Sequence, residues 1–583
     1  MYLKAFIFCL LLFFAASPLI AAEQIEVVVR GLEGNALKNV QAALSLPEGI
    51  VRDGKVNFPW LEHFIRQADE KVRTALEPFG YYNPEIRIIL ETVNQELYRL
   101  LAEVEPGPPV RVSDVHIFLQ GPGSDEASLN ELIAQFPLKK GDILLQEEYE
   151  KAKGTLKARA LEAGYLDAEF STHRILVDRI EESARIELGM ETGPQYYFGE
   201  TSFEGAADYP DKFLKRYLAY KSGDVFSSVK LRQTQLNLIN SERFQEVIPS
   251  PEREKTEILH LPVVIRVKPA PSRRFRSGIG YGTDTGARFS IKYSDLNSLS
   301  RGHELRAELN ISERLQGVGV SYRIPGYKDL DSFTEFKGNA QREDTDTYET
   351  RIVSLEAGNT RSLGKGRLGT AYLRLHHEDS TVASEKNEAF LVLPGIRLSA
   401  NRYDNLIRPS RGYLYAAEVR GTHAYLGSDI GFIQGILQGS ILIPLPWRLS
   451  LYSRIRAAAT AQEDALSEIP ASLRFFAGGD RSVRGYKYQS LGPKDEKGEV
   501  TGGKHLIEGS VEIERALFSD WGIAAFYDAG NAFNSLSDIQ MYQGAGLGLR
   551  YYTQIGAIRL DIARQIDVDN PSTRIHFSMG IEL

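Results

Sequence analysis

The residues after about position 270 alternate between apolar side chains and polar or glycine residues, and no other feature limits the possible folds as strongly. The alternation is clearest in residues 288–293, 304–311, 544–551 and 574–583. Successive side chains of a β-strand point to opposite faces, so each segment predicts a strand with one apolar and one polar face. The helical periodicity of the first half does not continue beyond Pro269-Ala270-Pro271.

A soluble sandwich also contains such strands, so alternation alone does not identify a membrane barrel. The segments after Arg273 number about sixteen, more than one sandwich needs, and many have about the 9–11 residues with which a tilted strand crosses a bilayer. We therefore predict a 16-stranded antiparallel transmembrane β-barrel over residues 271–583. Its apolar side chains would face lipid and its polar side chains the lumen.

The N-terminus has the pattern of an export signal. Lys4 precedes the apolar run 5–16, and the small residues Ala21-Ala22 follow, so residues 1–22 predict a secretory signal peptide. The alternative is a buried N-terminal helix. No apolar stretch of about 18 residues occurs beyond this segment, which excludes a membrane-spanning helix there. Cys9 is the only cysteine, so the exported chain offers no disulfide, thiolate metal site or cysteine nucleophile.

The sequence gives little support to nucleic-acid binding or catalysis. The net charge is −8, without the basic excess that nucleic acid attracts. Residues 278–282 mimic a dinucleotide fingerprint, but no helix follows. His576 and Ser578 share one strand face, where lining of the lumen is favoured over a barrel phospholipase, and His376-His377 point to opposite faces and cannot ligate one metal. We expect no enzyme, no cofactor and no metal.

The first half repeats one unit of roughly 80–90 residues. The matching pairs Gly80-Tyr81 and Gly164-Tyr165 follow the long helices of the first two copies, where a glycine is typical. Each copy reads β-α-α-β-β and leaves sheet edges that can pair with an extended segment of another chain. The alternative is that the copies act only as spacers. The predicted copies span residues 23–109, 110–194 and 195–270.

One connection in the second half is unusually long, from about Ala461 to Gly503, and a connection of this length is usually functional. It contains Arg484 between Val483 and Gly485. Such an arginine is usually solvated. If the loop folds back into the lumen, however, Arg484 can pair with Glu512 and Asp528 on the two following strands, and a confined pair of this kind is strong.

The string from Gly478 to Tyr486 resembles the lumen-loop signature of the BamA/TamA outer-membrane assembly superfamily. The resemblance continues through residues 527–533 and 555–561, with an upstream Asp404…Pro409…Gly412 pattern. The repeats resemble POTRA domains, so the resemblance spans the chain after the signal. Three POTRA copies with a sixteen-strand barrel resemble the TamA group, the translocation and assembly module subunits. BamA-type chains carry five copies, and two-partner secretion translocators carry two.

The resemblance implies a site and a function. Val483, Arg484, Gly485 and Tyr486 would form the lumen-loop motif, with Glu512 and Asp528 as partners of Arg484. The chain would assist insertion or secretion of outer-membrane proteins such as autotransporters, without enzymatic chemistry. The implied partners are a TamB-like periplasm-spanning protein at the first POTRA domain, unfolded clients and the bilayer of the bacterial outer membrane. The alternative is a two-partner-secretion-type translocation channel.

The resemblance also implies a seam where the first predicted strand, 275–283, meets the last, 573–583. Glycines weaken a strand because they pack poorly, and a weak seam could open sideways to offer an edge to a client strand. The equally weighted alternative is that these glycines only relieve crowding in the lumen. The seam glycines are Gly278, Gly280, Gly282 and Gly580.

Overall fold

The computed structural model describes residues 25–52, 55–94, 97–255, 259–405, 408–462, 465–537, 539–554 and 556–579. The predicted signal peptide, residues 1–22, lies outside the described residues. The chain forms two compact units. Residues 1–202, 219–233 and 250–264 make up the first unit, and residues 203–218, 234–249 and 265–583 the second. None of the described helices has both the length and the apolar character needed to cross a membrane.

The first repeat is a three-stranded sheet with two main helices. Its strands run in the order β1-β5-β4, with β1 parallel to β5. The apolar stripe of α3 buries Leu61, Phe64 and Val72. Trp60, in the first turn of the helix, is 57 % exposed, and its ring lies against the loop at Gly49. The elements are β1 (Ile25–Arg30), α2 (Gly34–Ala43), β2 (Val51–Arg52), β3 (Lys55–Val56), α3 (Phe58–Leu76), η1 (Glu77–Phe79), β4 (Glu85–Thr92) and β5 (Tyr98–Glu105).

The second and third repeats share this topology, because the last strand is again central, in the orders β6-β8-β7 and β10-β11-β9. The β-α-α-β-β pattern is therefore confirmed in all three. The second repeat comprises β6 (Arg111–Gln120), α4 (Ala127–Ala134), α5 (Gln146–Glu162), β7 (Glu169–Asp178) and β8 (Ser183–Glu191). The third comprises β9 (Tyr197–Glu204), α6 (Asp211–Lys215), α7 (Ser228–Asn240), β10 (Phe244–Pro251), η2 (Arg253–Lys255) and β11 (His260–Pro269).

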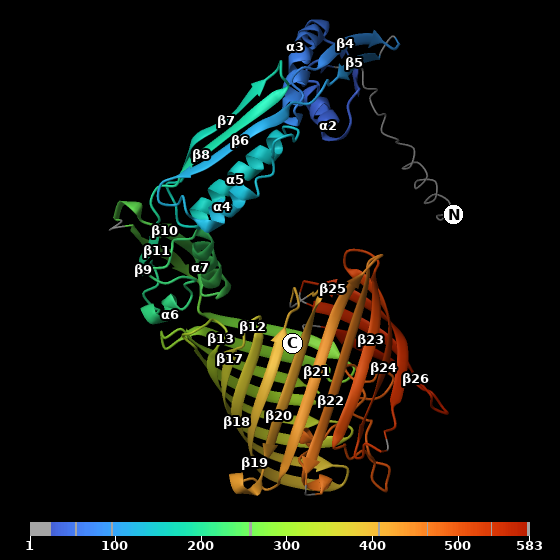
Figure 1. Cartoon of the computed structure of the whole chain (residues 1–583). Helices are drawn as coiled ribbons and strands as arrows, with labels where there is room; N and C mark the ends of the chain where they lie inside the picture. The colour runs from blue at the N-terminus through green and yellow to red at the C-terminus, as the bar shows by residue number, and fades with distance from the viewer. Residues whose placement is uncertain are drawn as a thin grey trace, which may run out of the picture. The chain divides into compact units, whose positions relative to one another are not determined.

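The second half is a closed barrel of 16 strands, β12 to β27, in sequence order (Figure 1). Each strand is antiparallel to the next, so the predicted fold class is confirmed. The strands are β12 (Arg273–Gly282), β13 (Gly286–Ser298), β14 (His303–Ser312), β15 (Leu315–Pro325), β16 (Phe333–Asp344), β17 (Tyr348–Ser362), β18 (Arg367–Val382), β19 (Glu385–Asn401), β20 (Gly412–Thr422), β21 (Phe432–Leu445), β22 (Leu449–Gln462), β23 (His505–Ala516), β24 (Trp521–Phe533), β25 (Tyr542–Thr553), β26 (Gly556–Ile566) and β27 (Thr573–Met579).

The alternation in the sequence becomes an apolar exterior and a polar interior. Phe275, Ile279 and Leu547 are 76 %, 77 % and 70 % exposed on the outer face. Asp528 and Arg550, on the opposite face of their strands, are 0 % and 2 % exposed. Apolar side chains outside and enclosed charges inside are what a barrel surrounded by lipid requires.

Candidate functional site in the barrel lumen

The connection between β22 and β23 folds back into the barrel. It contains two short helices, η4 (Leu466–Glu468) and η5 (Ala471–Leu473), and isolated bridges join Phe475 to Gly503 and Ala477 to Leu491. Apolar residues of the loop pack against residues of the barrel wall. These apolar contacts hold the loop in the lumen in addition to the charged contacts. The buried members of this cluster are Ala458, Phe475, Ala477, Val483, Tyr486, Leu491, Leu506 and Ala532.

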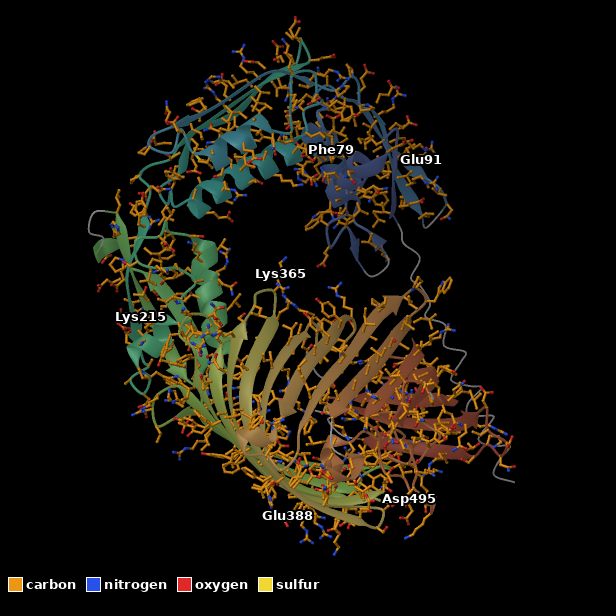
Figure 2. All side chains as sticks on the ribbon, turned by 60° about the horizontal axis from the view of Figure 1, so that its bottom comes forward. Phe79, Glu91, Lys215, Lys365, Glu388 and Asp495 are labelled. Atoms are coloured by element: carbon orange, nitrogen blue, oxygen red, sulfur yellow. The ribbon has the colours of Figure 1, made fainter. Side chains whose placement is uncertain are left out.

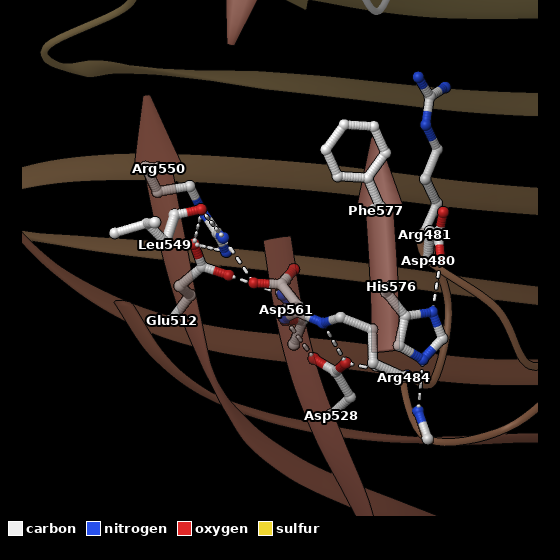
Figure 3. A network of polar contacts seen from close by, with 12 residues as sticks. Asp480, Arg481, Arg484, Glu512, Asp528, Leu549, Arg550, Asp561, His576 and Phe577 are labelled. Atoms are coloured by element: carbon white, nitrogen blue, oxygen red, sulfur yellow. Dashed lines mark hydrogen bonds and ion pairs between the residues drawn. The ribbon is translucent and has the colours of Figure 1, made fainter. Parts of the chain in front are cut away.

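Arg484 is 5 % exposed and meets several carboxylates (Figure 3). Its Nε and Nη2 donate to the two carboxylate oxygens of Asp528 at 2.7 and 2.9 Å. Its Nη1 donates to Glu512 Oε2 at 2.9 Å and to Asp561 Oδ2 at 3.0 Å. The backbone N–H of Arg484 also donates to Asp528 Oδ2, at 3.1 Å, and the guanidinium lies 3.3 Å from the ring centre of Phe526.

A second arginine completes the network. Arg550 on β25 donates through Nη2 to Glu512 Oε1 at 2.8 Å and through Nη1 to Asp561 Oδ1. Glu512 and Asp561 therefore bridge Arg484 and Arg550, and cations alternate with anions across the enclosed wall (Figure 3). Charge-assisted bonds of this kind are strong when every member is paired, and loss of one member leaves a buried charge.

The lumen face of β25 makes room for this network with glycine. A Cβ atom at Gly544 would lie 2.0 Å from the carbonyl oxygen of Arg484, and one at Gly548 would lie 2.0 Å from Asp561 Oδ1. Neither approach is compatible with a side chain. The glycine stripe of β25 is thus the surface on which the loop rests.

The same loop reaches the last strand through His576. The backbone N–H of Gly485 donates to His576 Nε2 at 2.9 Å, so Nδ1 carries the proton of the neutral ring. Nδ1 then donates to the carboxylate of Asp480 (Figure 3). The hydroxyl of Thr283, in the turn between β12 and β13, donates to both carboxylate oxygens of Asp480 at 3.1 Å, and the N–H of Asp480 donates to Asp284 Oδ2 at 2.5 Å. We call the group Thr283, Asp284, Asp480 and His576 the clasp.

The clasp lies at the closure of the barrel. Among the described residues, which end at Met579, β12 pairs with β27 at Tyr281 with Met579 and at Gly282 with Ser578. The N–H of Thr283 adds a bond to the carbonyl of Phe577 at 3.0 Å. Asp480 of the loop therefore links the first hairpin to the last strand at the closure.

The predicted seam glycines have different surroundings. A Cβ at Gly280 would lie 2.9 Å from the carbonyl oxygen of Met579, while Gly278 and Gly282 face side chains of β13 or of the β12–β13 turn. Gly580 lies outside the described residues.

Three clasp residues also lie close enough for metal ligation. The ligand atoms of Asp284, Asp480 and His576 are within 4.8 Å of one another. A metal on Nδ1 of His576 would require a proton on Nε2, directly opposite the N–H of Gly485. The hydrogen-bond geometry therefore favours a clasp without a metal.

The sequence analysis predicted that Arg484 pairs with Glu512 and Asp528, and the structure contains both ion pairs. It missed Asp561, Arg550, Phe526 and the clasp. Strand parity could have found Arg550 and Asp561, because alternation already places both on the lumen face. It does not say which lumen residues are neighbours across strands, since that depends on register.

Comparison with known proteins supports this architecture. Residues 297–583 match the Omp85 superfamily domain, and residues 26–106 match POTRA domain TamA domain 1. Residues 196–270 match a POTRA model described as surface antigen variable number repeat.

Several curated relatives are named outer membrane protein assembly factor BamA. That of Nitratidesulfovibrio vulgaris is 23 % identical over 410 residues, 66 % of this chain and 51 % of the relative. That of Neisseria meningitidis is 21 % identical, with 94 % of this chain and 77 % of the relative covered. The chain spans about half the length of the first of these. The crystal structure of BamA from Haemophilus ducreyi lacking POTRA domains 1–3 has a TM-score of 0.69 at 18 % identity and covers 81 % of this chain and 99 % of that one, which shows a shared fold.

Proposed function

We propose that this chain, an Omp85 superfamily barrel preceded by POTRA domains, assists insertion or translocation of other outer-membrane proteins and performs no enzymatic chemistry. The observation that carries the proposal is the closure of the barrel between its first and last strands, which the lumen loop joins through Asp480 and His576. A barrel whose first and last strands separate has an edge that a client strand can pair with.

The chain lies in the outer membrane with its POTRA domains in the periplasm. β12 directly follows the third repeat, so the barrel end at which β12 begins is periplasmic. The turn between β12 and β13, which bears Thr283 and Asp284, is then at the external end. Release of the clasp would therefore loosen the seam from the outside.

The proposed mechanism needs no nucleotide. Once the seam opens, a client strand pairs with the freed edge of β12, whose backbone N–H and C=O groups would otherwise lack partners. Each hydrogen bond that the client strand forms with β12 offsets part of the free energy needed to open the seam. The energy comes from folding of the client or from a periplasmic partner.

We further propose that the chain acts as the TamA-type subunit of a translocation and assembly module with autotransporters among its clients. The first repeat matches a model described for the first TamA POTRA domain, and the chain has three repeats rather than five. A TamB-like periplasm-spanning protein is then expected at residues 23–109. The boundaries of the domains, 23–109, 110–194, 195–270 and 271–583, belong to the same proposal.

Affinity purification from envelope membranes tests the partner. The full chain should retain a TamB-like protein, and a variant lacking residues 23–109 should lose it while the barrel stays folded. Retention by the shortened variant would place the docking site elsewhere. Isolation of one dedicated secreted protein in its place would favour the two-partner-secretion alternative.

A disulfide lock tests the seam. Gly282 and Ser578 are register partners across the closure, so Gly282→Cys with Ser578→Cys should join β12 to β27. The matched control is Gly278→Cys with Ser290→Cys, which joins β12 to β13. Oxidation should abolish client assembly in the first pair only, and reduction should restore it. Full activity of the oxidised first pair would contradict seam opening.

A further inference from the structure

The outer face of the barrel has a cavity at the periplasmic ends of β18, β19 and β20. Its volume is about 580 Å³. Lys365 lies in the turn that precedes β18 (Figure 2). The residues that line the cavity are Lys365, Arg367, Arg402, Tyr413 and Tyr415.

Strand register brings these residues together. Arg367 is the cross-strand partner of Ala400, and Ala400 is the partner of Tyr415. The N–H of Arg402 donates to the carbonyl oxygen of Tyr413 at 2.8 Å, one step nearer the periplasm. Ala400, which is buried, therefore lies between Arg367 and Tyr415 across the three strands.

The cavity opens on the face of the barrel that lies against lipid. Side chains an even number of positions apart along a strand share a face, because the period of a strand is two. The positions that matter here lie eight after Arg367, six before Arg402 and four after Tyr415. Those positions hold Leu375, Ile396 and Val419, which are exposed apolar side chains. The cavity therefore lies at the level of the periplasmic leaflet, where tyrosine and basic side chains meet lipid headgroups.

The charge of the cavity is uncompensated within the described part of the chain. Lys365, Arg367 and Arg402 form no ion pair with a described carboxylate, and Arg367 donates only to the carbonyl oxygens of Gly364 and Leu363, each at 3.3 Å. The next carboxylate along the chain, Asp404, accepts bonds from Ser410 and Arg411.

The lumen face of the same strands differs sharply. Arg374 pairs with Glu356 at 2.6 Å, and Arg397 pairs with Glu418 at 2.7 Å. Each of these two lumen arginines therefore has a carboxylate partner within the protein. The three outer cations are thus left to meet an anion from outside the chain.

We propose that this cavity binds the phosphate of an anionic phospholipid in the periplasmic leaflet. Arg367 and Arg402 donate to the phosphate oxygens, for which a guanidinium is well suited, and Lys365 adds positive charge at the rim. Tyr413 and Tyr415, whose rings are parallel within 6°, lie beside the headgroup. Such a contact would fix the height of β18–β20 in the membrane, on a part of the wall distinct from the seam.

Lipid retention by the full chain tests the proposal. Arg367→Gln with Arg402→Gln removes two charges at nearly constant volume. The matched control is Lys328→Gln with Arg448→Gln, which removes two exposed charges from other periplasmic turns. Each protein is purified in detergent, mixed with phosphatidylglycerol or phosphatidylcholine, and measured by native mass spectrometry. Unchanged heat modifiability verifies that each barrel is folded.

The cavity pair should retain roughly thirtyfold less phosphatidylglycerol than the unmodified chain, since each of the two basic residues near a lipid surface adds about 1 kcal/mol, and the control pair should retain as much as the unmodified chain. Phosphatidylcholine should be retained less than phosphatidylglycerol. Equal retention by the cavity pair and the unmodified chain would overturn the proposal, as would an equal loss in the control pair.

Two measurements on the unmodified chain distinguish a phospholipid from free phosphate. One is binding of inorganic phosphate alone, and the other is retention of phosphatidylglycerol in excess inorganic phosphate. Binding of inorganic phosphate that depends on Arg367 and Arg402, without retention of lipid, would overturn the lipid and point to a free anion. Retention of phosphatidylglycerol in the presence of excess inorganic phosphate would support the lipid.

Discussion

At the scale of single residues, Arg484 connects the lumen loop to three strands of the wall. It contacts Asp528 on β24, Glu512 on β23 and Asp561 on β26. Three carboxylates enclosed in one region repel each other without a cation between them. Arg484 therefore stabilises the wall as much as it anchors the loop.

Replacement of this residue should be costly. Arg484→Ala leaves Asp528 buried without its main partner, which is expected to cost about 3–5 kcal/mol. Arg484→Lys should recover only part of this, because an ammonium group does not reach three carboxylates in a planar fork. The measurement is heat modifiability, namely the temperature at which the band of the folded barrel disappears in gel electrophoresis. Arg481→Ala, at an exposed position of the same loop, is the control, and equal effects of the two alanine variants would refute the pairing.

Asp284 gives the clasp a pH dependence. Burial, followed by the nearby charge of Asp480, raises the pKa of Asp284 from 3.8 to about 6. A carboxyl group whose pKa is raised on folding favours the folded state most below its unfolded pKa, and this contribution is lost as pH rises through about 6. The compact barrel should therefore withstand a higher temperature at pH 5 than at pH 7, and Asp284→Asn should flatten this difference. An unchanged slope in the variant would exclude Asp284 as the cause.

At this scale the sequence predicted a part of the site. Arg484 could be found because it lies in a long glycine-flanked loop, and Glu512 and Asp528 because alternation points both inward. His576 and Asp480 could not be joined from sequence, since 95 intervening positions separate a loop tip from a strand whose register was unknown. The protonated nitrogen of His576 follows only from the N–H of Gly485.

At the scale of elements, β25 is the strand on which the loop depends most. The lumen-facing positions of β25 are occupied by glycine where the loop and Asp561 approach the strand. The alternation of the sequence predicted a strand here, and glycine as part of its polar face. It did not predict the reason, because close contact between a loop and a strand is a tertiary property.

Substitution within this stripe should displace the loop. Gly544→Ala places a methyl group against the backbone of Arg484, which is expected to cost about 1–3 kcal/mol and to lower client assembly. Gly435→Ala on β21 is the control, because no atom lies within 4 Å of the added group. Protease sensitivity of the loop, measured on folded barrels, should rise in the first variant only. Equal resistance of both would show that the loop does not rest on β25.

The closure between β12 and β27 should loosen when the clasp is removed. His576→Ala deletes the hydrogen bonds to Asp480 and Gly485, and the loss of two bonds of about 1 kcal/mol each corresponds to roughly thirtyfold. Disulfide formation between Gly282→Cys and Ser578→Cys should be slower by about this factor. His376→Ala, a buried lumen histidine on β18, should leave the rate unchanged. A fall in both variants would point to general destabilisation of the barrel.

At the scale of the whole molecule, three β-α-α-β-β repeats precede one closed barrel, and this order was readable from periodicity. Helical stripes and strand alternation are local signals that survive in a single sequence. The closure cannot be predicted from such local signals, because it joins residues nearly 300 positions apart, such as Tyr281 and Met579. That closure, with the loop contacts that join its two strands, is the basis of the proposed function.

The central claim is that client strands pair with the edge of β12, and site-specific photocrosslinking tests it most directly. A photoreactive phenylalanine analogue at Phe275, which is exposed on β12, should form adducts with the terminal strand of a client during assembly. The same analogue at Leu437, exposed on β21 in the middle of the wall, should form none. Client adducts at Leu437 as abundant as those at Phe275, or none at Phe275 while assembly proceeds, would contradict the account.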